Sequence, residues 1–319
     1  MNLVDALVLK NLKGVGDVTV TKLMDYACSN GISTLEDLAA AGSSNLPLSR
    51  PPDNLIQFIN SGFFDDTRHE IQESLARWDQ EGITTLHKYS PKYPIRLLEL
   101  SDPPPFLFCK GNLDLLENSK AIAVVGTRNN TSKGKVITEK TVQAFHRFQF
   151  VIVSGLALGI DTIAHKSALE CGAPTVAVLV DLAKVSPSQN KGLANEILNN
   201  GGLLVAENQP DTPTIAALFA KRDRIQAGLS TSTFAIETSK GGGTMHAVKA
   251  AGKLSRPVFV PDPIAARYSD LSEEAIQGTQ YLIENGLARA YTSHSYESIS
   301  NELQGVANRI SNDQQESIN

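Results

Sequence analysis

The segments AIAVVGTR, residues 121–128, and FVIVSGLALGID, residues 150–161, decide the fold. Each starts as a short apolar run, ends in a glycine-containing loop, and is followed by a helical pattern. The same alternation continues with four further apolar runs, Thr175–Val180, Leu203–Ala206, Thr233–Ile236 and Val258–Val260. Strands that alternate with helices predict an α/β fold with a Rossmann-like, mostly parallel sheet and helices on both faces.

The sequence around this core divides into regions of different character. Residues 1–86 have apolar residues spaced three and four apart, which predicts a small N-terminal helical domain. Residues 87–120 are rich in proline, which opposes regular helices, and we expect an extended lead-in there. We expect the Rossmann-like core to occupy residues 121–292 and a partly disordered C-terminal tail to occupy residues 293–319.

A glycine-containing turn lies between two helical patterns near the start of the chain. Its sequence, Leu12-Lys13-Gly14-Val15-Gly16, is similar to a helix-hairpin-helix motif. Glycines let such a turn close and expose backbone N–H groups at the start of the second helix, where a DNA phosphate can lie. A turn that only packs against its neighbours is the alternative.

The charge of the chain is unevenly distributed. The whole chain carries a net charge of −5, which by itself argues against binding a polyanion. Residues 121–260, however, hold fifteen Lys and Arg against nine Asp and Glu, a net charge of +6. A basic region within an acidic protein is typical of a phosphate-binding face, although lysines on solvated helix surfaces give the same count.

Several classes of protein are poorly supported by the sequence. The start of the chain does not match a signal peptide, and no apolar run approaches the ~20 residues that span a bilayer, so we expect a cytoplasmic protein without membrane contact. The three cysteines are far apart and the histidines are isolated, so we expect no disulfide framework and no metal site. The glycine spacing is not GxGxxG, and we expect no cofactor.

The loops at the strand ends carry the candidate binding residues, because ligands of an open parallel sheet bind beyond the carboxyl ends of its strands. After the first strand come Gly126, Thr127 and Arg128, and then Lys133 at the start of a helix. Glycine permits close backbone approach, and the planar guanidinium of arginine suits a phosphate. The second strand ends in Ser154-Gly155, which we include in the candidate phosphate-binding site.

Asp161 and His165 are four residues apart and share one face of the helix that follows the second strand. That spacing allows an acid–base pair, but no nucleophile is evident, since Ser154 is not in a GxSxG elbow. A structural role, with Asp161 capping the helix and His165 hydrogen-bonded within the loop layer, is the interpretation we favour.

Two later loops add cations and glycines. Lys221, Arg222 and Arg224 form a basic cluster at the start of an amphipathic helical pattern, and Phe219 just before them can stack on a base. Successive phosphates of a DNA strand are the expected ligands of this cluster. Glycines in the next loop allow close approach to an anion, or alternatively form a flexible turn; its candidate residues are Gly242, Gly243, Thr244 and Lys249.

Taken in order, these loops resemble the DprA/Smf family of DNA-processing proteins. The similarity runs from about Tyr93 to Ser293, and its most recognisable part is Ser154-Gly155-Leu156-Ala157 with Gly159-Ile160-Asp161. Further matching residues are Tyr93-Pro94, Asp102-Pro103-Pro104, Lys110-Gly111, Ala123–Arg128, Ala164-His165, Pro187, Asn190 and Gly278.

The resemblance implies that the chain protects single-stranded DNA and loads the RecA recombinase onto it, as in natural transformation. It also implies a homodimer without catalytic turnover. The family's DNA pocket corresponds to Gly126, Arg128, Lys221, Arg222 and Arg224.

Two departures from the family pattern favour a second hypothesis. The family usually has Arg-Asn-Arg-Ile-Ile where this chain has Arg222-Asp223-Arg224-Ile225-Gln226, and the glycine loop also differs. The alternative is a nucleotide-binding sensor or an N-glycosidic nucleotide hydrolase on the same scaffold. In that case Asp161, Glu237 or His165 assists the cleavage.

Overall fold

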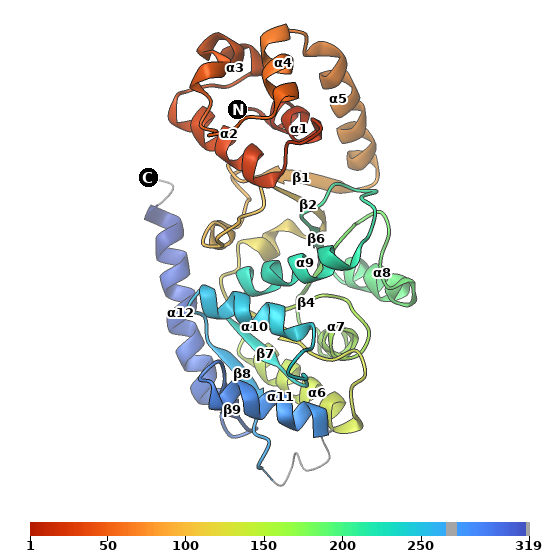
Figure 1. Ribbon diagram of the computed structural model, residues 1–319. Coiled ribbons are helices and arrows are strands. Elements are labelled where there is room, and N and C mark those ends of the chain that lie inside the picture. Colours follow the sequence, from red (N-terminus) through yellow and green to blue (C-terminus); the bar gives the residue numbers. More distant parts are fainter. Residues whose placement is uncertain (266–272, 317–319) are drawn as a thin grey trace. The chain divides into compact units, whose positions relative to one another are not determined.

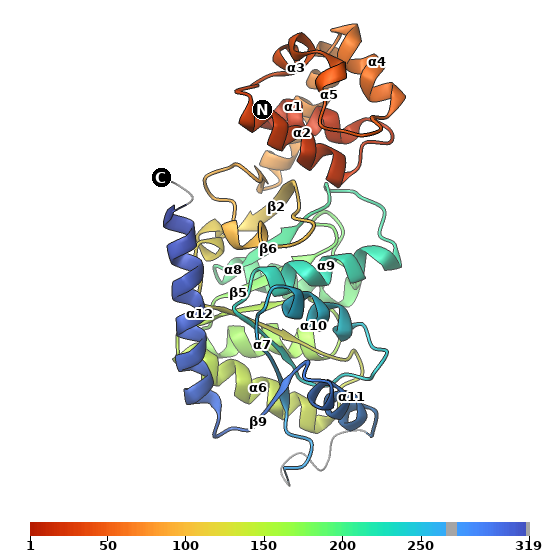
Figure 2. The ribbon, with the colours of Figure 1, turned by 60° about the vertical axis from the view of Figure 1, so that its left-hand side comes forward.

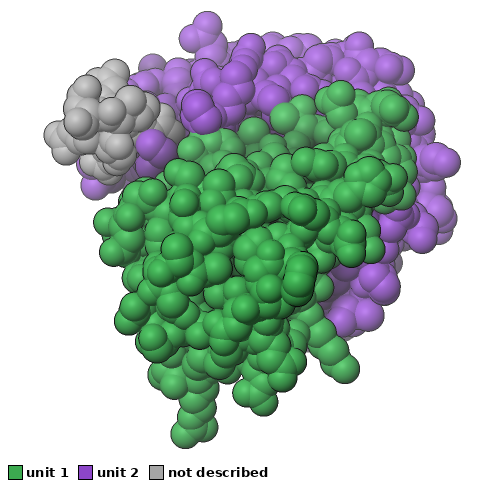
Figure 3. Space-filling model, turned by 90° about the horizontal axis from the view of Figure 1, so that it is seen from above, with its two compact units in different colours: residues 1–90, 104–107 green, residues 91–103, 108–319 purple. Residues whose placement is uncertain are grey.

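The computed structural model describes residues 1–265 and 273–316, which form two compact units (Figure 3). Unit 1 comprises residues 1–90 and 104–107, and unit 2 comprises residues 91–103 and 108–319. The predicted lead-in, residues 87–120, is therefore divided between the two units.

Unit 1 is mainly helical, and an ion-pair network joins three of its helices. Arg68 donates from Nε to Asp5 Oδ1 over 2.7 Å and also pairs with Glu36. Asp5 is buried and in addition accepts a hydrogen bond from the Leu35 N–H. The network thereby connects α1, α3 and α5. The helices of unit 1 are α1 (Leu3–Asn11), α2 (Asp17–Ser29), α3 (Leu35–Ala41), α4 (Asp53–Ser61) and α5 (Asp65–Gln80).

Two features of unit 1 differ in detail from expectation. Residues Ile83–His87 form a strand, β1, which the helical interpretation of residues 1–86 did not include. The hairpin between α1 and α2 turns at Gly14, whose φ of +84° suits glycine. Asp17 begins α2 and pairs with Lys10, so a carboxylate stands at the helix start where a phosphate was expected. DNA contact at this hairpin stays a prediction.

Unit 2 contains a mostly parallel sheet, which confirms the predicted fold class. Along the sheet its strands follow the order β2-β6-β5-β4-β3-β7-β8-β9, and β2 alone among these pairs antiparallel, with β6. The predicted runs all contain strands, whereas β2 and β9 were not predicted. The bounds are β2 (Phe106–Gly111), β3 (Ala121–Val125), β4 (Val151–Ser154), β5 (Thr175–Leu179), β6 (Leu203–Ala206), β7 (Ser232–Ala235), β8 (Val258–Pro261) and β9 (Arg289–Tyr291).

Helices cover both faces of this sheet, which explains why every residue of β3 is apolar and buried. On one face Ile122 and Val124 pack with α6, α7 and α12, and on the other face Val125 packs with α9 and α10. The helices of unit 2 are α6 (Ser132–Arg147), α7 (Ile160–Cys171), α8 (Lys191–Asn199), α9 (Ala216–Gly228), α10 (Thr244–Lys253), α11 (Glu273–Glu284) and α12 (Tyr296–Glu316).

The end of the described chain corrects one expectation. Residues 296–316 form the long helix α12, visible in both ribbon views, where a partly disordered tail was expected (Figures 1 and 2). Ile299 and Leu303 of α12 are buried in the core cluster that contains Phe145 of α6, and this apolar packing stabilises the helix. Residues 317–319 of the predicted tail lie outside the described residues.

The strand order reverses at β3. From β3 the chain proceeds through β4, β5 and β6 in one direction and then returns to β7 on the other side of β3. The carboxyl ends of β3 and β7 are therefore neighbours, with Val125 opposite Ala235. Ligands of open α/β sheets bind at such a reversal point, because the flanking connections leave in opposite directions.

The loop after β7 depends on a glycine in α11. A Cβ on Gly278 would lie 1.7 Å from the backbone oxygen of Thr238, so we expect Gly278→Ala to lower the free energy of unfolding by about 1–3 kcal/mol or more. Gly252→Ala in α10 is the matched control, since its Cβ meets nothing within 4 Å, and we expect it to raise stability by up to ~1 kcal/mol. Urea unfolding measures both, and equal effects would contradict the close packing of α11.

Candidate functional site

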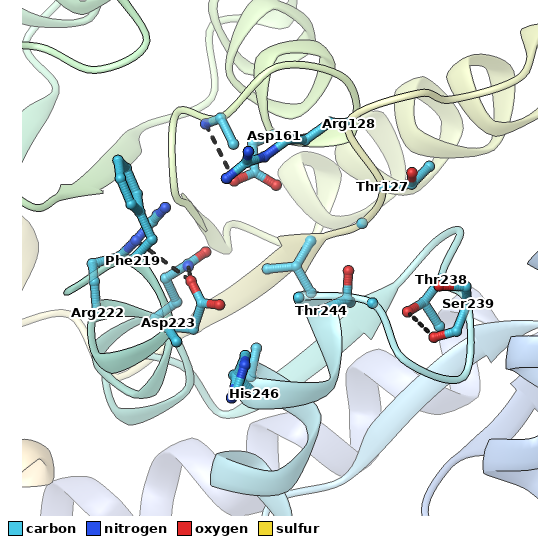
Figure 4. A pocket seen from close by; sticks show the side chains of 18 of the residues that line it. Thr127, Arg128, Asp161, Phe219, Arg222, Asp223, Thr238, Ser239, Thr244 and His246 are labelled. Atoms are coloured by element: carbon cyan, nitrogen blue, oxygen red, sulfur yellow. Dashed lines mark hydrogen bonds and ion pairs between the residues drawn. The ribbon is translucent and has the colours of Figure 1, made fainter. Parts of the chain in front are cut away.

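A pocket of about 470 Å³ lies at the reversal point, beyond the carboxyl ends of β3 and β7 (Figure 4). The loops after β3 and β7 line it, together with the first turn of α10 and one side of α9. The structure brings eight of the predicted binding residues to this pocket: Gly126, Thr127, Arg128, Phe219, Arg222, Gly242, Gly243 and Thr244. Asp161 also lines it.

The loop after β3 is held close to the start of α7. A Cβ on Gly126 would lie 2.5 Å from the Ile160 side chain, and a Cβ on Gly159 would lie 2.3 Å from the Thr127 carbonyl oxygen. Gly159 has a φ of +77°, and the N–H of Ile160 donates to the same Thr127 oxygen over 3.2 Å. These contacts require glycine at both positions and fix where the loop presents its side chains.

Arg128 stands at the mouth of the pocket. Its side chain is exposed, and its guanidinium lies 6.0 Å from the ring centroid of Phe219, a residue of α9. Arg128 forms no ion pair with any residue in the described part of the chain. The cation is therefore available to a ligand, and the nearby ring offers it an aromatic neighbour.

Glu237, one of the proposed hydrolase residues, has a different position from the one expected. It is fully buried, lies outside the pocket, and accepts hydrogen bonds from the Thr131 N–H over 2.9 Å and from the Thr131 hydroxyl over 2.7 Å. A Cβ on Gly134 would lie 2.2 Å from its Oε2. A protein carboxylate thus occupies the start of α6, where we had expected a ligand phosphate beside Lys133.

Arg222 is buried beneath the pocket. Its Nη1 donates to the Val178 carbonyl oxygen at the end of β5 over 2.8 Å. Gly155 makes room for this guanidinium, because a Cβ there would lie 1.6 Å from Nη1. Gly155 is therefore needed for packing the arginine, and it does not line the pocket itself.

Asp161 is held by the loop that follows β4. Its Oδ2 accepts hydrogen bonds from the Gly155 N–H over 3.1 Å and from the Ala157 N–H over 3.4 Å. Burial raises the pKa of this carboxyl, while the Arg222 charge and the two N–H groups act in the opposite direction. The carboxylate thus has a structural role, but it orders the preceding loop and does not cap α7 as expected, because the N-cap of α7 is Gly159 and has no side-chain hydrogen bond.

Asp223 follows Arg222 on α9 and lines the pocket. Its Oδ1 lies 3.4 Å from Arg222 Nε and accepts a hydrogen bond from Gln226 Nε2 over 3.0 Å. Burial raises the pKa of Asp223 to about 6, against the opposing charges of Arg222 and Arg128. Asp223 is therefore a pocket residue whose carboxyl group has a pKa of about 6.

Two predicted residues near β4 are buried away from the pocket. The Ser154 hydroxyl donates to the Val124 carbonyl oxygen over 2.7 Å. His165 Nδ1 lies 2.8 Å from the Thr175 hydroxyl, and burial lowers the pKa of His165 to about 3. A neutral, enclosed imidazole is poorly suited to proton transfer, which supports the structural role.

Four predicted cations do not line the pocket: Lys133, Lys221, Arg224 and Lys249. The basic cluster lies inside α9, which begins at Ala216, and not at the start of a helix as expected. Arg224 pairs with Glu207 over 2.9 Å and with Asp102 over 2.7 Å, and Lys221 pairs with Glu207 over 3.1 Å. Lys249 lies farther along α10 and lines a different groove. The expectation of successive phosphates on Lys221, Arg222 and Arg224 is corrected: this cluster is largely occupied by carboxylates and a carbonyl oxygen of the protein.

Several pocket residues were missed by the sequence reasoning. Thr238 and Ser239 follow β7 after only two residues, and that position was the signal that could have identified them. Gln226 and His246 also line the pocket, from α9 and α10. Helical spacing from Arg222 places Gln226 one turn later, but His246 had no comparable signal.

Residues 1–265 and 273–316 contain no group of three or more His, Cys, Asp or Glu side chains that could hold a metal ion. No helix within these residues is long and apolar enough to cross a membrane.

Comparison with known proteins gives the family. The model of the family described as DNA recombination-mediator protein A matches residues 84–304, more than two thirds of the chain. The chain belongs to this family. This confirms the resemblance to DprA/Smf proteins, so the chain is a DNA-processing protein of this family.

Curated relatives and solved structures of this family agree with the assignment. The DNA processing protein DprA of Streptococcus pneumoniae is 38% identical over 196 residues, 61% of this chain and 68% of that protein. DprA of Bacillus subtilis is 32% identical over 202 residues, 63% of this chain and 68% of that protein. The crystal structure of the S. pneumoniae protein has a TM-score of 0.73 at 30% identity and covers 93% of this chain and 96% of that chain.

A second solved structure concerns the single-stranded DNA binding mode of DprA from Helicobacter pylori. It has a TM-score of 0.60 at 28% identity and covers 70% of the chain described here and 96% of the H. pylori chain.

The role of Glu237 in this family member can be tested by unfolding. We expect Glu237→Ala to lower the free energy of unfolding by about 1–3 kcal/mol, because the Thr131 N–H and hydroxyl lose their buried acceptor. Glu237→Gln should cost less, since one amide oxygen can still accept. Urea titration measures both, with exposed Glu196→Ala on α8 as the matched control. A loss in Glu237→Ala no larger than in the control would refute the structural role of the Glu237–Thr131 hydrogen bonds.

Proposed function

We propose that this pocket and its rim bind single-stranded DNA. The observation that carries the proposal is the exposed Arg128 guanidinium beside Phe219, at the mouth of a pocket where the strand order reverses. A cation next to an aromatic ring suits a phosphate and its attached base, the two parts of a single strand. The H. pylori relative, whose structure concerns single-stranded DNA binding, supports the same ligand class.

The two parts of a nucleotide find different partners here. Arg128 lines the pocket, as does the start of α10, where Gly242 and Gly243 precede the first helical residue, Thr244. Both the cation and the helix start favour negative charge. Phe219 offers an apolar face for a base. Exposed Ile215, just before α9, adds apolar surface close by in the sequence. We therefore assign phosphate contacts to the rim and base contacts to Phe219 and the interior.

We further propose that the chain acts as a homodimer and loads the RecA recombinase onto the bound strand. The family description, a recombination mediator, is consistent with the loading part of the proposal. Sedimentation of the purified chain tests the homodimer, and RecA filament formation on strands coated with single-strand-binding protein tests the loading.

Cleavage of an N-glycosidic bond receives less support from the geometry. Of the three residues offered for that chemistry, Glu237 and His165 are buried outside the pocket. Asp161 lines the pocket, but its Oδ2 is occupied by two backbone N–H groups. We therefore propose a binding protein without its own catalytic centre.

The first test of the proposal removes the cation at the rim. We expect Arg128→Ala to weaken binding of fluorescent oligo-dT by at least about tenfold and to reduce the slope of log affinity against log salt by roughly 0.7, the value of one phosphate contact on a single strand. Arg147→Ala is the matched control, because Arg147 is exposed in the last turn of α6, away from the pocket lining. Unchanged affinity and slope in Arg128→Ala would overturn the proposed site.

A second test uses pH. Asp223 has its pKa raised to about 6, so the carboxylate is negative above that pH and becomes neutral below it. Loss of this charge removes repulsion of nearby phosphates, and we expect oligo-dT affinity to rise severalfold between pH 7.5 and pH 5. Asp223→Asn should flatten most of this rise. Because the His246 imidazole lines the same pocket, the titration is repeated in His246→Gln. A rise of the same size in Asp223→Asn would contradict the role of Asp223.

A further inference from the structure

The Asp223 carboxylate in the pocket has hydrogen-bond acceptor capacity that the described residues do not fill. Gln226 Nε2 and Arg222 Nε both approach Asp223 at Oδ1. The other oxygen, Oδ2, accepts no hydrogen bond from any residue that the structure describes. The Asp223 side chain is 17% exposed and lines the pocket, so its free lone pairs can face a ligand.

The position of Asp223 on α9 relates it to the aromatic ring. Phe219 is four residues earlier, so both side chains lie on the same face of the helix, one turn apart. Figure 4 shows both on the side of the pocket formed by α9, with His246 of α10 beside them. A base that packs against Phe219 can thus direct its polar edge toward Asp223.

The charges of the interior favour a neutral ligand group there. Two carboxyl groups, those of Asp161 and Asp223, line the pocket. Arg222 lines it too, but its guanidinium donates to a backbone carbonyl oxygen of the protein. A phosphate placed between these carboxylates is repelled, whereas a nucleobase is uncharged and can hydrogen-bond. The phosphates accordingly stay at the rim with Arg128, and the base enters.

We propose that Asp223 makes this pocket selective for guanine within a single strand, an inference that rests on the proposed DNA-binding function. Guanine presents two adjacent donors, N1–H and the N2 amino group, which match the two oxygens of one carboxylate. Oδ1 keeps a lone pair for this although it also accepts from Gln226. Thymine offers a single N–H between two carbonyl oxygens, and those oxygens face the carboxylate unfavourably. Adenine and cytosine each offer one amino group beside a ring acceptor.

The test compares short strands in the wild-type protein. The probes are fluorescent pentamers of thymidine in which the central nucleotide is deoxyguanosine, deoxyinosine or thymidine, with deoxyadenosine and deoxycytidine as further arms. We expect guanine to bind at least about fivefold more tightly than thymine, the discrimination typical of a bidentate contact. Inosine, which lacks the N2 amino group, should fall between them. This series needs no protein variant, so a folding defect cannot imitate the result.

A variant then assigns the preference to Asp223. Asp223→Asn removes a negative charge and raises affinity for every pentamer, but the ratio of guanine to thymine affinity cancels that effect and should fall to about one. Glu170→Gln makes the same charge change at the exposed far end of α7 and should leave the ratio unchanged.

The outcomes separate the two proposals. Equal affinities for guanine and thymine pentamers in the wild-type protein, or a preference that persists in Asp223→Asn, would overturn the guanine selectivity and leave DNA binding intact. No binding of any pentamer, together with no binding of longer oligo-dT, would overturn the proposed function itself.

Discussion

The reversal of strand order at β3 is the constraint from which the rest of the site follows. It places the carboxyl ends of β3 and β7 next to one another, with Val125 opposite Ala235. The connections that leave these ends run in opposite directions, so a pocket forms between their loops. The loops keep their shape through close backbone contacts, among them the approach of Gly159 to the Thr127 carbonyl oxygen, which a larger residue would block.

Charge inside the protein is arranged differently from charge along the sequence. The region with an excess of cations does contain the pocket, yet Arg224 and Lys221 pair with Glu207, and Arg222 is buried against Val178. Burial makes such pairing necessary, because an unpaired charge in the interior is costly. The cation left at the pocket mouth, Arg128, is available for a phosphate, while Asp161 and Asp223 make the interior unfavourable for one. An acidic protein can therefore present a local surface suited to a nucleic acid.

This division of the pocket explains how departures from the family pattern can coexist with the family's fold. Asp223 lies on α9 and lines the pocket, so its carboxylate bears on the chemistry that the interior offers to a ligand. Glu237 shows the opposite case. It was a candidate for chemistry on a ligand, but its carboxylate accepts two hydrogen bonds from Thr131, the N-cap residue of α6, and positions the loop that carries Arg128. Both residues are acidic, so residue type does not distinguish the pocket-lining role of Asp223 from the structural role of Glu237; their surroundings in the fold do.

By itself, the sequence determined the fold class, the six central strands, and the loops after β3 and β7 as the place of the site. Those conclusions depend on local patterns, since apolar runs and glycine-containing ends reflect buried parallel strands directly. Strands β2 and β9 escaped notice because one is proline-flanked and the other has only three residues. The packed helix α12 was taken for a tail because its polar composition hides the buried positions Ile299 and Leu303. Only the tertiary structure decided which of the cations and carboxylates face the pocket, because ion pairing and burial join residues far apart in the chain, such as Arg224 with Asp102 and Glu237 with Thr131.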